Sequence, residues 1–244
     1  MDQGAVMNQP AVSWKPDWEE TKRHFTDWWN RTGMVLATHN NPYRALPMEP
    51  VDDPGPAPSI EYLYTVPRYR VHSMHYGVAH HDYILDNIPV PHLDHGPGSL
   101  AMFLGSEPHF TRDTVWYAPC MDPQAPESHP PLRFNPHNKW WKLTEETMRA
   151  AMERADGRYL VGFPDLIENI DILAAMRDPQ RLLFDLIERP EWVEQKAREI
   201  NQVWFGAFQR LYDIIRLPDG SSTLCTAGWT GIPICHGSSH RAGR

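Results

Sequence analysis

The sequence is poor in cysteine, in long apolar runs and in positive charge, and each absence excludes a class of protein. Three cysteines in 244 residues are too few and too scattered for a disulfide framework. No stretch approaches the roughly 18 consecutive apolar residues of a membrane span, and the N-terminus lacks the basic and apolar segments of a signal peptide. The formal net charge of −8 disfavours nucleic acids and anionic membranes as partners. We therefore expect a cytoplasmic protein that acts on a small molecule and binds neither nucleic acid nor membrane.

The periodicity of the chain predicts one domain between two irregular ends. Residues 1–13 show no periodicity and are expected to be disordered. Residues 235–244 have neither helical nor strand periodicity, which predicts an irregular tail. The single domain expected between them spans 14–234 and is long enough to bury a full core.

Within this domain, short apolar runs alternate with longer amphipathic ones. The clearest case is 158–173, where a buried-strand pattern passes into a turn and then a helix. Strand patterns lie at 34–38, 83–90, 113–118, 132–134, 158–163 and 222–229. Helix patterns lie at 17–32, 65–79, 99–104, 144–155, from 166, at 179–188 and at 190–215. The alternation predicts an α/β fold whose sheet has about five parallel strands.

The first candidate site follows the predicted strand at 158–163. Asp165, Asn169 and Asp171 come within one and a half turns of its end. A carboxylate at the carboxyl end of a parallel strand can protonate a substrate carbon or hold a cationic group. The alternative is that Asp165 only caps the helix that begins next to it, with Asp171 on the solvated side.

The second candidate site is the loop that follows the predicted strand at 83–90. His92, Asp94 and His95 combine acid, base and hydrogen-bonding groups, and Gly98 allows close backbone approach to a ligand. The spacing of these residues is not a metal-binding signature, so no metal site is predicted. The alternative is a polar, solvated turn.

The third candidate site is an aromatic surface for a flat substrate. Trp116 and Tyr117 lie in the predicted strand at 113–118, and Trp229 ends the predicted strand at 222–229. Ligand sites are mostly lined by such side chains. The alternative is that the three side chains belong to the core.

The residues 160–178 (LVGFPDLIENIDILAAMRD) and 182–193 (LLFDLIERPEWV) resemble the uroporphyrinogen decarboxylase superfamily, in particular its bacterial uroporphyrinogen-decarboxylase-like proteins. Three further stretches agree with this resemblance, namely WKPDW at 14–18, GPGSL with FLGSEP at 96–108, and DTVWY at 113–117. The resemblance covers about residues 14 to 222. It implies a TIM-type (β/α)8 barrel, here an incomplete one that ends before the last strands.

The resemblance implies decarboxylation of a tetrapyrrole carboxylate, a lyase reaction of porphyrin biosynthesis that needs no cofactor. Asp165 and Asp94 would then orient or protonate the substrate. One part of the family pattern is missing, because the arginine-containing N-terminal run that grips substrate carboxylates is absent. The basic groups nearest to its place are Arg44 and the pair Arg68 and Arg70.

Two other functions remain open at this point. A corrinoid- or thiol-linked methyltransferase of the same superfamily would use a methyl donor and a zinc-activated thiolate. The second alternative is a non-catalytic barrel fragment that acts only as a binding or interaction protein. An unclosed sheet would leave apolar edges exposed, which predicts a homodimer.

Overall fold

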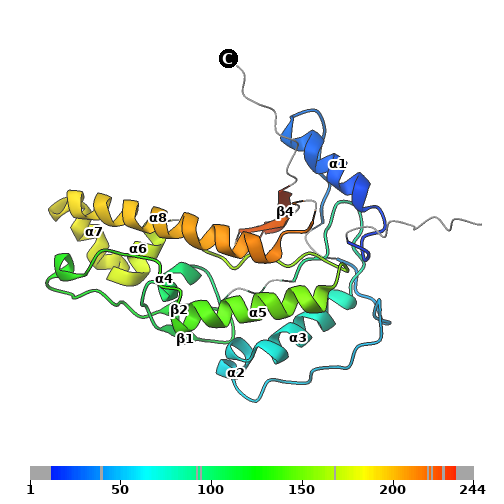
Figure 1. The fold of residues 1–244 in the computed structure, drawn as a ribbon, viewed down its shortest axis with the longest axis horizontal. Coiled ribbons are helices and arrows are strands. Elements are labelled where there is room, and N and C mark those ends of the chain that lie inside the picture. Colours follow the sequence, from blue (N-terminus) through cyan, green and yellow to red (C-terminus); the bar gives the residue numbers. More distant parts are fainter. Residues whose placement is uncertain are drawn as a thin grey trace, which may run out of the picture.

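The computed structural model describes residues 12–38, 41–91, 93, 95–167, 169–218, 220, 222–226 and 229–234. Most of its regular structure is helical (Figure 1). The helices are α1 (Trp18–Trp29), α2 (Ile60–Thr65), α3 (Pro67–Ala79), α4 (Ser99–Phe103), α5 (Lys139–Ala155), α6 (Asn169–Arg177), α7 (Pro179–Glu188), α8 (Pro190–Ile215) and the short 3-10 helix η1 (Pro126–Ser128). The strands are β1 (Pro108–Phe110), β2 (Val115–Tyr117), β3 (Ser222–Thr226) and β4 (Trp229–Ile234).

The sheet structure corrects the predicted fold class. Strand β1 pairs antiparallel with β2, and β3 pairs antiparallel with β4, as two separate two-stranded sheets. Among the described residues there is no parallel sheet, so the prediction of an incomplete (β/α)8 barrel with about five parallel strands is wrong. The segments 34–38, 83–90, 132–134 and 158–163 form no strand in the part that the structure describes.

Proline explains why one pair of predicted strands forms no parallel ladder. The amides of Leu160 and Gly162 donate to the carbonyls of Pro89 and Pro91, at 3.1 and 3.3 Å. The residue numbers of donor and acceptor increase together from the first hydrogen bond to the second, so the two segments run side by side in the same direction. A parallel ladder also needs amides that donate in return, and proline has none. The contact therefore remains one-sided.

The helix predictions succeeded where the termini carry strong local signals. Helix α7 begins as predicted, because the Asp178 side chain accepts from the Arg181 amide and proline occupies the first helical position. Helix α5 ends at Ala155, before Asp156 and Gly157, which both have positive φ, although it begins at Lys139 and not at the predicted Thr144. The predicted helices at 99–104 and 190–215 are confirmed as α4 and α8.

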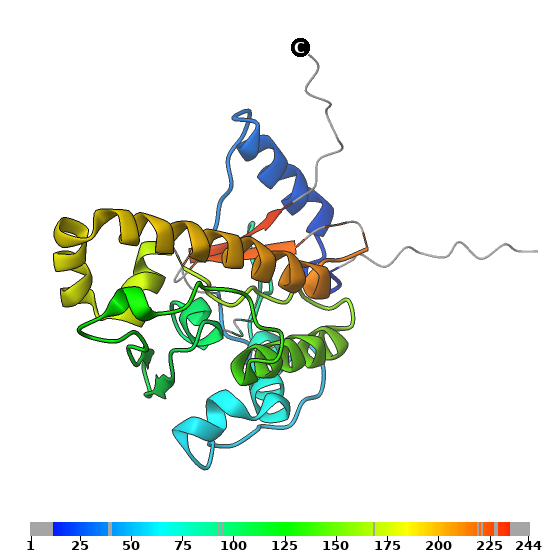
Figure 2. The same ribbon diagram turned by 60° about the vertical axis from the view of Figure 1, so that its left-hand side comes forward.

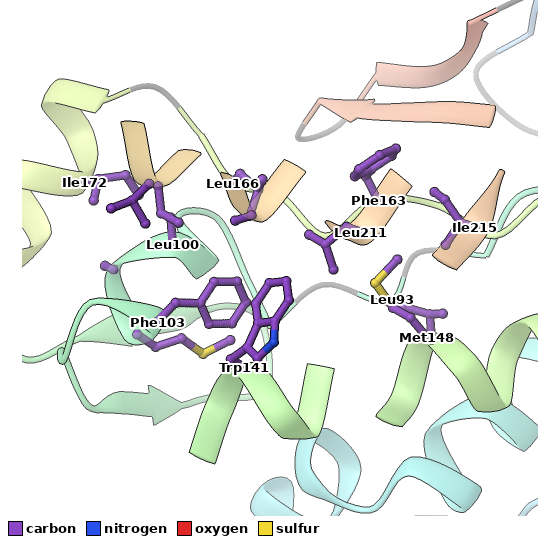
Figure 3. Close-up of a cluster of buried hydrophobic side chains, with 14 of the residues drawn as sticks. Leu93, Leu100, Phe103, Trp141, Met148, Phe163, Leu166, Ile172, Leu211 and Ile215 are labelled. Carbon is purple, nitrogen blue, oxygen red and sulfur yellow. The ribbon is translucent and has the colours of Figure 1, made fainter. Parts of the chain in front are cut away.

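The core lies between α5 and α8, which run next to each other across the molecule (Figures 1 and 2). Helix α5 buries one side chain on nearly every turn, including Trp141 and Met148. Figure 3 shows these two side chains facing residues from α4, α8 and the segment 163–166. Phe163 and Leu166, from a predicted strand and the turn after it, are thus core residues between two helical layers.

The two predicted irregular ends are mostly outside the described residues. This applies to 1–11 and to 235–244. Residues 12 and 13, which were expected to be disordered with the rest of the N-terminus, are packed on the domain. Val12 is fully buried, and the Ser13 amide donates to the carbonyl of Gly157 at 2.8 Å. Within the described part of the chain, no helix combines the length and apolar character needed to cross a bilayer.

Candidate functional site

Asp165 joins the two loops that the sequence singled out. Its backbone carbonyl accepts from the amide of Ser99, the first residue of α4, at 2.9 Å. Its side chain is buried, and Oδ1 accepts from the Ile167 amide at 3.0 Å. Helix α6 begins only at Asn169, so Asp165 does not cap a helix from Leu166, and it stabilises a tight turn in which Ile167 has positive φ.

Two glycines allow the loop before α4 to lie against this turn. Gly96 and Gly98 both have positive φ, at 86° and 83°. A Cβ atom on Gly96 would lie 2.7 Å from Cβ of Val115 in β2. A Cβ atom on Gly98 would touch Ile167 and Tyr117 at 3.5 and 3.6 Å. We call His95, Gly96, Gly98, Tyr117 and Asp165 the glycine-loop cluster.

His95 lies at the buried end of the glycine-loop cluster. The hydroxyl of Tyr117 donates to its backbone carbonyl at 2.8 Å, which fixes the position of the residue. Its side chain is 0% exposed, and neither ring nitrogen makes a regular hydrogen bond within the described residues. Burial lowers the pKa of His95 to about 3, and the charge of Arg70 lowers it further, while the Tyr64 backbone, which approaches the ring outside regular hydrogen-bond geometry, raises it. The imidazole is therefore neutral at physiological pH.

Arg70 supplies a buried positive charge next to His95. It lies in the first turn of α3, is only 6% exposed, and its guanidinium carbon lies 5.1 Å from the ring centre of Tyr64. The rings of Tyr64 and Phe110 are stacked at 4.8 Å, and Phe110 meets Trp140 edge-on at 5.7 Å. We call Tyr64, Phe110 and Trp140 the aromatic row. These half-buried rings lie beside His95, whose ring centre is 6.5 Å from that of Phe110.

The electrostatics of this region suit an anionic ligand. A cation in a site of low exposure attracts a carboxylate more strongly than a solvated cation does, because water screens it less. A neutral imidazole can donate one hydrogen bond and accept another. Asp165 adds a buried carboxyl group on the neighbouring turn.

The structure brings together four of the predicted site residues, namely His95, Gly98, Tyr117 and Asp165. Asn169 is not among them, because its side chain donates to Asn201 of α8 at 2.9 Å on the surface. Asp171 is exposed, and Trp116 is 66% exposed on the outer side of β2.

Three predicted site residues cannot be assessed in the same way. His92 and Asp94 lie outside the described residues. For Trp229 only the backbone, in β4, lies within them.

Arg70 and the aromatic row were missed from the sequence. Arg70 had been noted only as one of several basic groups, although a usable signal was present. Its position belongs to a stripe with helical spacing that buries Val71, His75, Val78 and Ala79. Arg68, two residues earlier, is exposed. The helical spacing thus distinguishes the buried Arg70 from the solvated Arg68. The contact of Tyr64 with Phe110 joins distant segments of the chain and leaves no local pattern in the sequence.

A second buried polar group is centred on His75 of α3 and is fully connected. His75 bonds the Tyr159 hydroxyl through Nδ1 at 3.0 Å and the Glu49 carboxylate through Nε2 at 2.9 Å. Arg158 donates to the same carboxylate at 2.7 Å. Burial lowers the pKa of His75 to about 4, with Arg154 as the second cause. Since its polar groups satisfy one another, this group acts as a structural clamp.

Within the described residues, no group of three or more His, Cys, Asp or Glu side chains is arranged to hold a metal ion. Comparison of the chain with protein-family models, with curated proteins and with solved structures finds no match.

Proposed function

We propose that the glycine-loop cluster and Arg70 bind a carboxylated small molecule, and that the chain catalyses loss of CO2 from it. The observation that carries this proposal is the placement of His95. A fully buried imidazole with no regular hydrogen bond to any described residue costs folding free energy, about 1–3 kcal/mol. Such a cost calls for an explanation, and a ligand that supplies the missing partner is one.

The reaction requires three contributions from the protein. A cation must hold the substrate, an acid must protonate the carbanion, and the site must disfavour water. Arg70 is suited to the first of these roles by its burial and charge. Asp165, in its protonated form, is suited to protonate the carbanion, which is the role that the sequence predicts for it.

In the proposed step, the bond between the carboxylate carbon and its neighbouring carbon breaks. Its electron pair stays on the substrate and is stabilised by a conjugated ring. A proton from Asp165 then completes the new C–H bond, CO2 leaves, and a solvent proton restores the acid. No cofactor is required for this step.

The substrate class is supported by the sequence resemblance in 96–108 and 160–178, which suggests a tetrapyrrole. The aromatic row next to His95 is compatible with a flat ring system, because stacked aromatic contacts contribute about 0.5–1.5 kcal/mol each. The fold adds no support, since the parallel barrel is absent from the described residues. The methyltransferase alternative is not favoured by any feature of the described residues.

Calorimetric titration with anaerobic uroporphyrinogen tests the binding step. Wild-type protein is compared with Arg70→Met and with the matched control Arg68→Met, which removes an exposed charge from the same helical turn. We expect binding by wild type and Arg68→Met, and at least about a tenfold loss for Arg70→Met, since hydrogen-bonded charges contribute about 1.5–3 kcal/mol. Circular dichroism establishes that each variant is folded.

If wild-type protein does not bind the porphyrinogen, the tetrapyrrole assignment is wrong. If the two arginine variants bind equally well, Arg70 is not part of the site. A second variant, Asp165→Asn, keeps the acceptor for the Ile167 amide and removes only the acid. It separates binding from catalysis, because we expect it to bind the substrate and to release no CO2.

A further inference from the structure

Helix α7 has its polar and apolar faces the opposite way round from an ordinary surface helix. Its one fully buried charged residue is Asp185, which is 1% exposed. Leu182 is buried in the core, but the other four large apolar side chains are exposed, with Leu183 65%, Phe184 58%, Leu186 45% and Ile187 82% exposed. We call these four residues the α7 apolar face. A helix normally turns such a face to the core.

A buried ion pair holds α7 in this orientation. The Arg177 guanidinium and the Asp185 carboxylate meet at 2.6 Å, and both side chains are almost completely buried. Arg177 also donates to the carbonyls of Asp122 and Pro123, at 3.1 Å each. Arg189 adds a second bond to Asp185 at 2.8 Å. Turning the apolar face inward would leave Arg177 as an unpaired buried charge, which is strongly unfavourable.

The exposed apolar area is large for a single short helix. At roughly 200 Å² for a fully exposed large apolar residue, the four exposed fractions together leave about 500 Å² in solvent. This is near the upper end of the largest apolar patches found on monomers, about 300–600 Å². Two copies of the face would together bury about 1,000 Å², which is the size at which specific dimers begin.

We propose that the α7 apolar face is the contact through which two copies of this chain form a symmetric dimer. A second copy suits this face because Asp185, the one charged residue between Leu183 and Ile187, is buried against Arg177 and lies outside the face, so the face can meet itself without burying like charges. In an antiparallel pair, the positive N-terminal end of each α7 dipole lies beside the negative C-terminal end of its partner. Helix α7 lies at one end of the molecule (Figures 1 and 2), where two copies can approach each other.

Sedimentation velocity of the full chain over a range of concentrations tests this proposal. The wild type is expected at twice the chain mass of 28.2 kDa, with a dissociation constant in the micromolar range. Ile187→Glu is expected to weaken the dimer by more than about 100-fold, because two-fold symmetry buries two carboxylates at the contact. Phe205→Glu is the matched control, since Phe205 is 68% exposed on α8, outside this face.

Three outcomes would overturn the proposal. They are a wild type that stays monomeric at all concentrations, an Ile187→Glu variant that stays dimeric, and a Phe205→Glu variant that dissociates as strongly as Ile187→Glu. Thermal unfolding followed by circular dichroism shows whether both variants keep the fold. Because both substitutions are at exposed positions, each variant is expected to unfold at the same temperature as wild type at a concentration where the chain is monomeric.

Discussion

Replacing His95 by phenylalanine is expected to stabilise the protein while it removes a group of the proposed site. Phenylalanine has a ring of similar size and no polar atoms, so it relieves the cost of two buried ring nitrogens that make no regular hydrogen bond to the described residues. That cost is about 1–3 kcal/mol for a buried polar group. The ring would remain beside Phe110 and under the aromatic row.

The same substitution should also change how stability depends on pH. The pKa of His95 is about 3 in the folded chain, against an ordinary value of 6.5. Because the folded-state pKa is lowered, the neutral form favours folding, and its contribution is complete above pH 6.5 and declines as pH falls toward 3. Linkage between these two pKa values gives a loss of about 2 kcal/mol between pH 7.5 and pH 5.

Urea unfolding at pH 7.5 and pH 5 measures both effects. Wild type should lose about 2 kcal/mol more than His95→Phe between these two pH values, and the carboxylates that both proteins share cancel in this comparison. The reasoning would be refuted if His95→Phe were less stable than wild type at pH 7.5 and equally sensitive to acid. That result would mean that the imidazole is already satisfied by groups of the protein.

Three further substitutions test the packing. Asp185→Ala should lower the free energy of unfolding by about 3–5 kcal/mol in urea titrations, because Arg177 becomes an unpaired buried charge. A loss below about 1 kcal/mol would contradict the role of this ion pair. Gly96→Ala should lower the free energy of unfolding by more than about 2 kcal/mol, since the added Cβ would lie 2.7 Å from β2. The control Gly55→Ala should cost only about 1 kcal/mol for its positive φ, because its Cβ meets nothing within 4 Å. Equal melting temperatures for the two variants would argue against a close approach of the glycine loop to β2. Met148→Ala should lower the free energy of unfolding by about 2–5 kcal/mol, measured by calorimetry, because the side chain is fully buried between α5 and α8. A change of less than about 0.5 kcal/mol would show that Met148 does not belong to the core.

The helices were the predictable part of this fold because their signals are local. Asp178 and Pro179 start α7, and positive-φ residues at 156 and 157 end α5, without help from distant segments. The predicted strands at 113–118 and 222–229 contain β2 and β3, but the predicted strand at 158–163 did not form, because a strand needs a partner that can return its hydrogen bonds. Leu160 and Gly162 have the apolar pattern of a strand, but the segment beside them presents prolines.

The candidate site was predicted in part for a similar reason. Asp165 and His95 follow apolar runs, and the glycines beside His95 indicate a tight loop, so these residues could be found from local pattern alone. The burial of Arg70 and the contact of Tyr64 with Phe110 depend on how α2, α3 and β1 meet. The inverted orientation of α7 could not be read from its apolar periodicity, because a buried ion pair decides it.

The measurement that tests the proposed function most directly is anaerobic release of CO2 from uroporphyrinogen by the full chain. We predict release by the wild type and a loss of about 10²–10⁴-fold in rate for Asp165→Asn, the usual contribution of a positioned acid. The Arg68→Met control should keep the wild-type rate. Absence of CO2 release from the folded wild type, or an undiminished rate for Asp165→Asn, would contradict the assignment of decarboxylation to this cluster.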